Sequence, residues 1–344
     1  MRSLTTIATG ATLLCLAPMA RAQWATFQDQ TATRLNCAPG LGAADTQEKD
    51  YAWADFDQDG DTDLVVVRKS PYVTAGHFPN VFLRNENGVL TDRTAALASA
   101  SLVPGSLGML DATNDTDVVA VDVDGDGWID LVTATTLTAT QPQYIRVPRV
   151  YRNLGNQLGV WQGFLYDDPL RIDDMQPGAS WNGEQRFATV AAGDVDADGD
   201  IDLYFGDYQA GGARSIDVDD RLLLNNGAGY FTDATAARTT ATMVASTFTV
   251  TAALADMNLD GRLDIVKADA PTPNEVSIAY NTPANPGFFA GYQIALTSPV
   301  YGFSVGDLNN DNLPDLVYSD DGQDRYQLHT GVVAGQATFG PPIA

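Results

Sequence analysis

Aspartates recur in this chain at a spacing that suits a hard cation. Residues 193–207 read GDVDADGDIDLYFGD, which places Asp194, Asp196, Asp198 and Asp202 at positions 1, 3, 5 and 9 of one short loop. Alternate positions direct side chains towards one focus, a glycine at position 6 permits the tight turn, and a backbone carbonyl at position 7 adds an oxygen. Calcium accepts irregular cages of about six to eight oxygens, whereas magnesium demands a stricter octahedron. The spacing therefore predicts a calcium loop.

Five copies of this loop follow the pattern D-x-[DN]-x-D-[GN]-x-x-D, and each leads into a short apolar run. We therefore expect about five Ca²⁺ sites, in which position 7 contributes only its backbone carbonyl. The expected ligands are Asp55, Asp57, Asp59, Asp61 and Asp63; Asp122, Asp124, Asp126, Trp128 and Asp130; Asp194, Asp196, Asp198, Asp200 and Asp202; Asp256, Asn258, Asp260, Arg262 and Asp264; and Asp307, Asn309, Asp311, Leu313 and Asp315.

Position 12 distinguishes these loops from an EF-hand, which places a bidentate glutamate there. The residues found are Val66, Thr133, Phe205, Lys267 and Tyr318. The flanking segments also resemble strands. We therefore expect the aspartate at position 9 to close the cage, as either a monodentate or a bidentate ligand. The first three loops have aspartate at every ligand position and the glycine. The fifth departs most, because Asn312 replaces the glycine and Pro314 occupies position 8.

Electrostatic repulsion separates a metal cage from a merely acidic turn. Two carboxylates about 4 Å apart repel by roughly 4 kcal/mol at an effective dielectric constant near 20. Without a cation the loop would open or take up protons, so cation binding is coupled to folding. At free calcium tenfold above the dissociation constant, each site contributes about 1.4 kcal/mol of stability, or roughly 7 kcal/mol over five sites.

The loops mark a repeat with start-to-start spacings of 67, 72, 62 and 51 residues. A short strand-like run ending in Asn85, Asn153, Asn225 or Asn281 follows each of the first four loops, and F/L-x-D-x-T-A occurs at 27–32, 90–95 and 231–236. β-branched and aromatic residues fill the runs, and no amphipathic helix of three turns is evident. Repeats of about four strands predict an all-β fold and favour propeller blades. A long solenoid is the alternative.

The ends and charge of the chain bear on where it acts. Arg2, an apolar run and Ala20-Arg21-Ala22 predict a signal peptide over residues 1–22, followed by one domain over residues 23–344. Nothing later is long and apolar enough for a transmembrane segment. We expect a secreted, extracellular, periplasmic or cell-surface protein. Its formal charge of −25 excludes nucleic acid as a natural partner, although acidity alone also suits a solubilising surface. Removal of the predicted signal peptide would leave Cys37 as the only cysteine, so no internal disulfide is expected.

These loops, the segment NNGAGYFTDAT at 225–235 and TFG at 338–340 resemble the FG-GAP/VCBS repeat family, in its secreted bacterial form. The family includes the propeller of integrin α subunits. The resemblance covers most of residues 24–344 and implies a β-propeller of roughly five to seven blades, either closed or truncated at its C-terminus. It also implies structural Ca²⁺ in the hairpin between the first two strands of a blade, with partners contacting loops on the opposite face.

Three classes of function remain open, and the favoured one is a binding or adhesion module for a protein or carbohydrate. Lengthened connections at 134–149, 155–186 and 208–220 offer recognition surfaces. Four aromatic residues of the second connection offer rings that stack on sugars or pack against a protein partner, although such residues more often anchor a long loop to the core: Trp161, Phe164, Tyr166 and Trp181. The alternative is a polysaccharide lyase or hydrolase, but only His77 and His329 are present and no catalytic motif accompanies them. A purely structural surface component is the third possibility.

Overall fold

The computed structural model describes residues 28–38, 45–70, 78–136, 142–172, 186–208, 219–245, 248–270, 274–298, 300–320 and 322–344. The expected signal peptide, His77 and Trp181 lie outside these ranges. Strands dominate the described part of the chain, and its helices are one turn long. None of those helices has the length and apolar character needed to span a bilayer.

Antiparallel sheets follow one another along the chain, and each begins with a strand that leads into an acidic loop. Blade 1 contains β2 (Glu48–Ala54), β3 (Asp63–Lys69), β4 (Val81–Asn85) and β5 (Leu90–Asp92); blade 2 contains β7 (Asp115–Val121), β8 (Asp130–Thr135), β9 (Arg149–Asn153) and β12 (Phe164–Tyr166); blade 3 contains β13 (Phe187–Gly193), β14 (Asp202–Asp207), β15 (Arg221–Asn225) and β16 (Phe231–Asp233). Blade 4 contains β17 (Thr249–Ala255), β18 (Asp264–Asp269), β19 (Glu275–Thr282) and β20 (Asn285–Leu296); blade 5 contains β21 (Gly302–Gly306), β22 (Asp315–Ser319), β23 (Arg325–Gln327) and the hairpin β24 (His329–Val333) and β25 (Gln336–Phe339).

Short elements extend or connect the blades. The strand β1 (Leu35–Asn36) pairs in parallel with β5, and β6 (Ala100–Ser101) pairs in parallel with β12. The others are α1 (Thr31–Arg34), α2 (Thr94–Leu97), η1 (Gly108–Leu110), α3 (Gln143–Arg146), β10 (Asn156–Gln157), β11 (Val160–Trp161), η2 (Pro169–Arg171), α4 (Thr235–Arg238) and α5 (Ala241–Val244). The F/L-x-D-x-T-A segments at 90–95 and 231–236 begin with the fourth strand of a blade, β5 or β16. Their last residues begin the helical turn that follows, α2 or α4.

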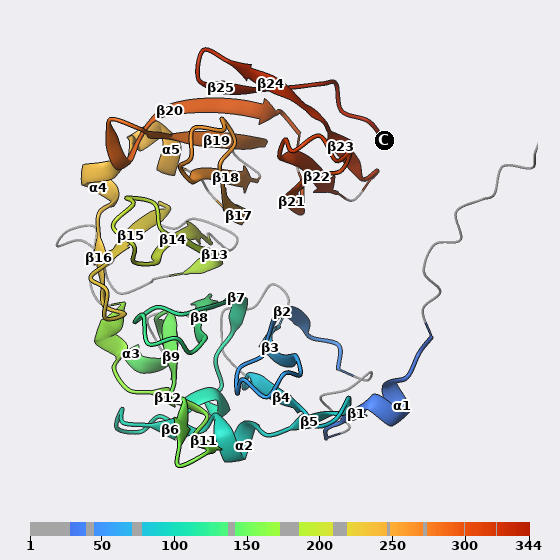
Figure 1. Ribbon diagram of the computed structural model, residues 1–344, viewed down its shortest axis with the longest axis vertical. Coiled ribbons are helices and arrows are strands. Elements are labelled where there is room, and N and C mark those ends of the chain that lie inside the picture. The colour runs from blue at the N-terminus through green and yellow to red at the C-terminus, as the bar shows by residue number, and fades with distance from the viewer. Residues whose placement is uncertain are drawn as a thin grey trace, which may run out of the picture.

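The blades surround a centre, and the first strand of each blade lies nearest to it (Figure 1). These inner strands pack in sequence, β2 beside β7, β7 beside β13, β13 beside β17 and β17 beside β21. The fold is a five-bladed β-propeller, which confirms the expected class and lies within the expected range of five to seven blades. The solenoid alternative is wrong, because the inner strands turn around one axis.

Apolar side chains fill each junction between consecutive blades. Position 2 of an acidic loop inserts into the next blade, and its side chain is at most 1% exposed at Phe56, Val123, Val195 and Met257. The facing positions lie four and two residues before the next loop, as at Val118 and Val190. Burying one such side chain contributes about 1.5–3 kcal/mol. The propeller is therefore held together chiefly by contacts between sheets.

The same positions are exposed where blades 5 and 1 stand apart, on the right of Figure 1. Tyr51 and Trp53 of β2 correspond to the interface positions of the other inner strands, yet they are 49% and 56% exposed. Leu308, the position 2 residue of the fifth loop, is 50% exposed. In the part of the chain that the structure describes, these two blade faces thus lack the neighbour that covers their equivalents elsewhere in the ring.

The expected connection at 155–186 is in part a strand. Phe164–Tyr166 forms β12, the outer strand of blade 2, and its aromatic rings pack inwards. Phe164 and Trp161 contact Phe82 of blade 1 at ring-centroid distances of 5.4 and 5.5 Å. Trp161, Phe164 and Tyr166 therefore anchor the core, and the interpretation of these three as sugar-stacking residues is wrong.

Carboxylates of the inner strands also tie neighbouring blades together. The Val118 backbone N–H donates to Asp50 Oδ2 at 3.1 Å, and the Val190 N–H donates to Asp117 Oδ2 at 2.8 Å. Burial raises the pKa of Asp50 to about 7, and the adjacent Asp117 carboxylate adds to the rise. Because the pKa is higher in the folded than in the unfolded chain, the folded state binds more protons between about pH 4 and pH 7. The stability that depends on this proton is present in acid and is lost as the pH rises through 7.

We expect Asp50→Asn to remove this pH dependence, since the amide keeps an acceptor for Val118 but cannot ionise. Urea unfolding at pH 5 and pH 8 should show the variant gaining about 1–3 kcal/mol over the wild type at pH 8 relative to pH 5. Asp324→Asn, at an exposed aspartate of blade 5, serves as the control and should show no such difference. An equal effect of Asp50→Asn at both pH values would contradict the assignment.

Candidate metal centres

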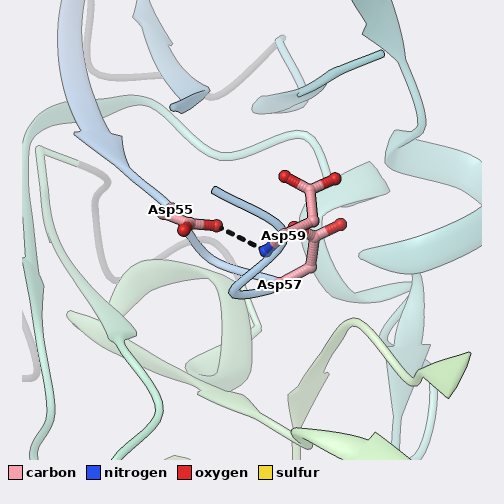
Figure 2. A group of neighbouring side chains, drawn as sticks. All are labelled: Asp55, Asp57 and Asp59. Carbon is pink, nitrogen blue, oxygen red and sulfur yellow. Dashed lines mark hydrogen bonds between the residues drawn. The ribbon is translucent and has the colours of Figure 1, made fainter. Parts of the chain in front are cut away.

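Each acidic loop joins the first two strands of its blade, and its first aspartate organises the turn. Asp55 accepts the backbone N–H of Asp59 at 3.0 Å (Figure 2) and that of Gly60, also at 3.0 Å. Asp256 and Asp307 accept the equivalent groups of their own loops at 2.8–3.1 Å. These hydrogen bonds hold positions 1 and 5 at one side of the loop.

The aspartate at position 9 fastens the loop to the sheet. One oxygen accepts the N–H of position 2, and the other accepts the N–H of the residue that ends the third strand, or its equivalent in blade 5. The distances are 3.2 and 2.7 Å at Asp63, 3.0 and 2.7 Å at Asp130, 3.0 and 2.9 Å at Asp202, 2.9 and 2.9 Å at Asp264, and 2.8 and 2.7 Å at Asp315. All five side chains are buried. The sequence pattern alone indicated only a ligand here, and this anchoring role was not predicted.

Burial disfavours the ionised form of the carboxylate at position 9. It raises the pKa of Asp63, Asp130, Asp202 and Asp264 to about 7 each, against the lowering effect of the two N–H donors, and nearby carboxylates of the same loop raise it further. A divalent cation among these groups would oppose both effects, because it favours the ionised carboxylates. The electrostatics of the loop therefore suit a bound cation.

The donor geometry of the first three loops fits a cation as well. Three groups of carboxylates have ligand oxygens within 4.8 Å of one another in the described part of the chain: Asp55, Asp57 and Asp59; Asp122, Asp124 and Asp130; and Asp194, Asp196 and Asp202. Four oxygens of these groups are buried and accept no hydrogen bond from the described residues: Asp57 Oδ2, which forms an ion pair with Arg84, and Asp124 Oδ1, Asp194 Oδ1 and Asp196 Oδ1. Buried acceptors without donors are costly, and a cation would satisfy them.

Loops 4 and 5 differ because position 3 is asparagine. Asn258 Nδ2 donates to Asp260 Oδ2 at 3.0 Å, and Asn309 Nδ2 donates to Asp311 Oδ2 at 2.9 Å. The amide thus partly occupies the oxygen that a cation would use.

At position 7, every loop directs its backbone N–H to the position 5 carboxylate, at 2.9–3.1 Å from Asp61, Trp128, Asp200, Arg262 and Leu313.

Two features of the loops escaped the sequence pattern. Position 4 has a left-handed backbone in all five loops, with φ of 56° at Gln58, 70° at Gly125, 62° at Ala197, 60° at Leu259 and 63° at Asn310. Four of these residues carry a Cβ, which makes the conformation unfavourable. The second feature is an arginine just before the third-strand asparagine in blades 1 and 2. Arg84 forms an ion pair with Asp57, and Arg152 Nε lies 2.7 Å from Asp124 Oδ2.

Comparison with known proteins agrees with the repeat. The FG-GAP-like repeat family matches residues 55–133 and 194–267. The solved structures to which the chain is similar include two lectins. One is from Agrocybe aegerita, described as recognising non-reducing terminal N-acetylglucosamine; it shares 20% identity and a TM-score of 0.45, over 87% of this chain and 66% of that one. The other is the BP39L lectin from Burkholderia pseudomallei, with 13% identity and a TM-score of 0.49, over 86% of this chain and 69% of that one.

The chain spans about two thirds of each lectin chain, and both similarities are too distant to indicate a ligand. No curated protein sequence matches the chain significantly.

The left-handed residue at position 4 can be tested in the fourth loop. Leu259 is 49% exposed, so Leu259→Gly removes the Cβ conflict with little loss of packing. We expect the unfolding free energy to rise by about 0.5–1 kcal/mol in urea titrations with chelator present. Gly261→Ala is the matched opposite: φ is +85° and no atom lies within 4 Å of an added Cβ, so strain alone should cost about 1–2 kcal/mol. A loss of stability in Leu259→Gly would contradict this account.

Proposed function

We propose that this five-bladed β-propeller, two segments of which match the FG-GAP-like repeat family, is an exported, calcium-stabilised module that binds a protein or carbohydrate ligand. One observation carries the binding role. A cavity of about 160 Å³ lies at the axis, at the end of the inner strands opposite to the acidic loops. Its walls come from blades 1 to 4, through Lys69, Asp115, Thr116, Ala188, Tyr208, Phe248 and Val250.

The cavity combines an aromatic wall with charged groups. The rings of Tyr208 and Phe248 meet edge to face at 4.8 Å, and Lys69 Nζ lies 5.0 Å from the Tyr208 ring centre. Asp115 is fully buried, and its Oδ2 accepts a 2.6 Å hydrogen bond from Asn80 Nδ2. Binding sites typically join apolar walls to a few fixed polar groups. This set suits a ligand group that has hydroxyls and one apolar face, such as a sugar ring or a polar side chain of a protein.

Calcium has a structural role in this proposal. Carboxylates, an asparagine amide and backbone carbonyls are hard oxygen donors, which is the chemistry that calcium prefers. The acidic loops and the cavity occupy opposite ends of the inner strands, so the cations would stiffen the blades without touching the ligand. Only Cys37 is available for a disulfide in the described residues, and cations would supply the cross-links that an exported chain otherwise takes from disulfides.

Calcium titration of the protein tests the stabilising role. We expect calorimetry to detect several ions per chain and the melting temperature to fall by more than about 10 °C with chelator, since several sites act together. Asp194→Ala together with Asp198→Ala should remove about one ion. Unchanged stoichiometry in that double variant would count against the assigned ligands, and no binding at all would refute calcium stabilisation.

Binding to immobilised glycans and candidate proteins tests the recognition role. We expect Phe248→Leu and Tyr208→Phe to weaken binding about tenfold while the protein stays folded, because each changes a cavity wall with a small loss of volume. Tyr230→Ala, an exposed tyrosine at the acidic-loop end, is the matched control and should bind as the wild type does. Equal binding by all three variants would place the ligand elsewhere. Turnover of a polysaccharide would instead favour an enzyme, and failure to bind any ligand would favour a purely structural component.

A further inference from the structure

An asparagine at or next to the end of the third strand makes the same contacts in blades 2, 3 and 4. Its backbone N–H donates to the position 9 aspartate of its own loop, and its side-chain amide donates to the position 8 carbonyl of that loop. The amide distances are 3.0 Å from Asn153 to Ile129, 2.9 Å from Asn225 to Ile201 and 3.1 Å from Asn281 to Leu263. Each asparagine is therefore part of its own loop.

The same amide group also reaches the acidic loop of the preceding blade. Its Nδ2 donates to the position 2 carbonyl there, at 2.8 Å from Asn153 to Phe56, 2.8 Å from Asn225 to Val123 and 2.7 Å from Asn281 to Val195. Position 2 in turn donates its N–H to the position 9 aspartate of that preceding loop. Hydrogen bonds thus run without interruption from the first loop to the fourth.

Close packing accompanies these hydrogen bonds. The turn after Asn281 rests on the third loop, where a Cβ added to Gly287 would lie 2.7 Å from Asp196 Cβ. The turn after Asn225 similarly approaches the second loop, where a Cβ added to Gly229 would lie 3.1 Å from a Val123 methyl group. A displaced loop would consequently disturb the turn of the next blade.

The relay ends at both edges of the ring. Among the described residues, Asn85 of blade 1 has no preceding blade beside it, and its amide donates to the Thr62 carbonyl of its own loop, at 3.0 Å. In blade 5, His329 replaces the asparagine, and its Nε2 pairs with the Gly331 carbonyl at 2.8 Å. Its Nδ1 is buried without a hydrogen bond, and no hydrogen bond from His329 to the fourth loop occurs among the described residues.

We propose that Asn153, Asn225 and Asn281 couple the acidic loops of blades 1 to 4, so that these loops order together, while the fifth loop lies outside this asparagine relay. Both hydrogens of each amide are satisfied only when the two loops that it bridges are closed. Opening either loop leaves a buried donor without an acceptor, which is costly. Closure of one loop therefore favours closure of its neighbour. If cations stabilise closed loops, as in the proposed function, occupancy of one loop raises the cation affinity of the next by linkage.

Hydrogen exchange measured by mass spectrometry, with chelator present, tests the coupling without relying on any metal. We expect Asn225→Ala to speed exchange about fivefold in residues 194–202 and also in residues 122–130, the scale set by one net hydrogen bond. Asn153→Ala should act likewise on residues 122–130 and 55–63, and it provides a second site should the first variant unfold.

Asn85→Ala is the matched control, since it removes the same amide where no preceding loop is bridged. Its effect should stay within residues 55–63. Faster exchange confined to a variant's own loop in both Asn225→Ala and Asn153→Ala would overturn the proposal.

Terbium luminescence provides a separate readout of cation affinity. Trp128, at position 7 of the second loop, is placed to sensitise an ion bound there. Asp194→Asn with Asp198→Asn disables the third loop, and we expect terbium to bind the second loop about fivefold more weakly. The same changes at Asp307 and Asp311 of the fifth loop should have no effect, and equal losses from both pairs would overturn the proposal. Absence of any terbium signal would refute the metal role, whereas the exchange result tests the coupling by itself.

Discussion

A buried aspartate at the start of the second strand fixes the geometry of every blade. Its two oxygens accept N–H groups from the acidic loop and from the end of the third strand, so one side chain joins three segments of the sheet. A protonated carboxyl would be a poorer acceptor for two donors, yet burial and neighbouring carboxylates favour protonation. A cation at the loop would resolve this conflict, because it favours the ionised form that the backbone also needs. A bound cation would thus both balance the negative charge of the loop and keep the strands of the sheet in place.

Much of the fold followed from the sequence because its signals are local. The spacing of aspartates from Asp55 to Asp315 predicted five hairpins, and strand-like runs between them predicted blades. The aromatic residues Phe164 and Tyr166 were harder to interpret, because blade 2 lacks the F/L-x-D-x-T-A signal that marks its outer strand elsewhere. A stretch of apolar residues in a long connection does not reveal whether it faces a ligand or the core.

The features missed at the candidate site depend on tertiary contacts. Nothing in the types Gln58, Ala197 and Leu259 signals a left-handed backbone, since the conformation is imposed by the hydrogen bonds around it. The asparagines were recognised as landmarks of the repeat, but their contact with a preceding loop lies about 86–102 residues away in sequence. The axial cavity draws on four blades, so no single segment of sequence contains its pattern.

Because consecutive blades are joined by the same contacts at each junction, the repeat unit is modular. Position 2 of each of the first four loops packs on the inner strand of the following blade, so the junction has a direction, and every unit carries both halves of it. Duplication of one whole unit therefore supplies its own complementary surfaces on both sides and requires no newly evolved contact. At the open edge, Leu308 on one side and Trp53 on the other present those same two halves. A propeller of this kind can change its blade number by gene duplication while each existing junction keeps its chemistry.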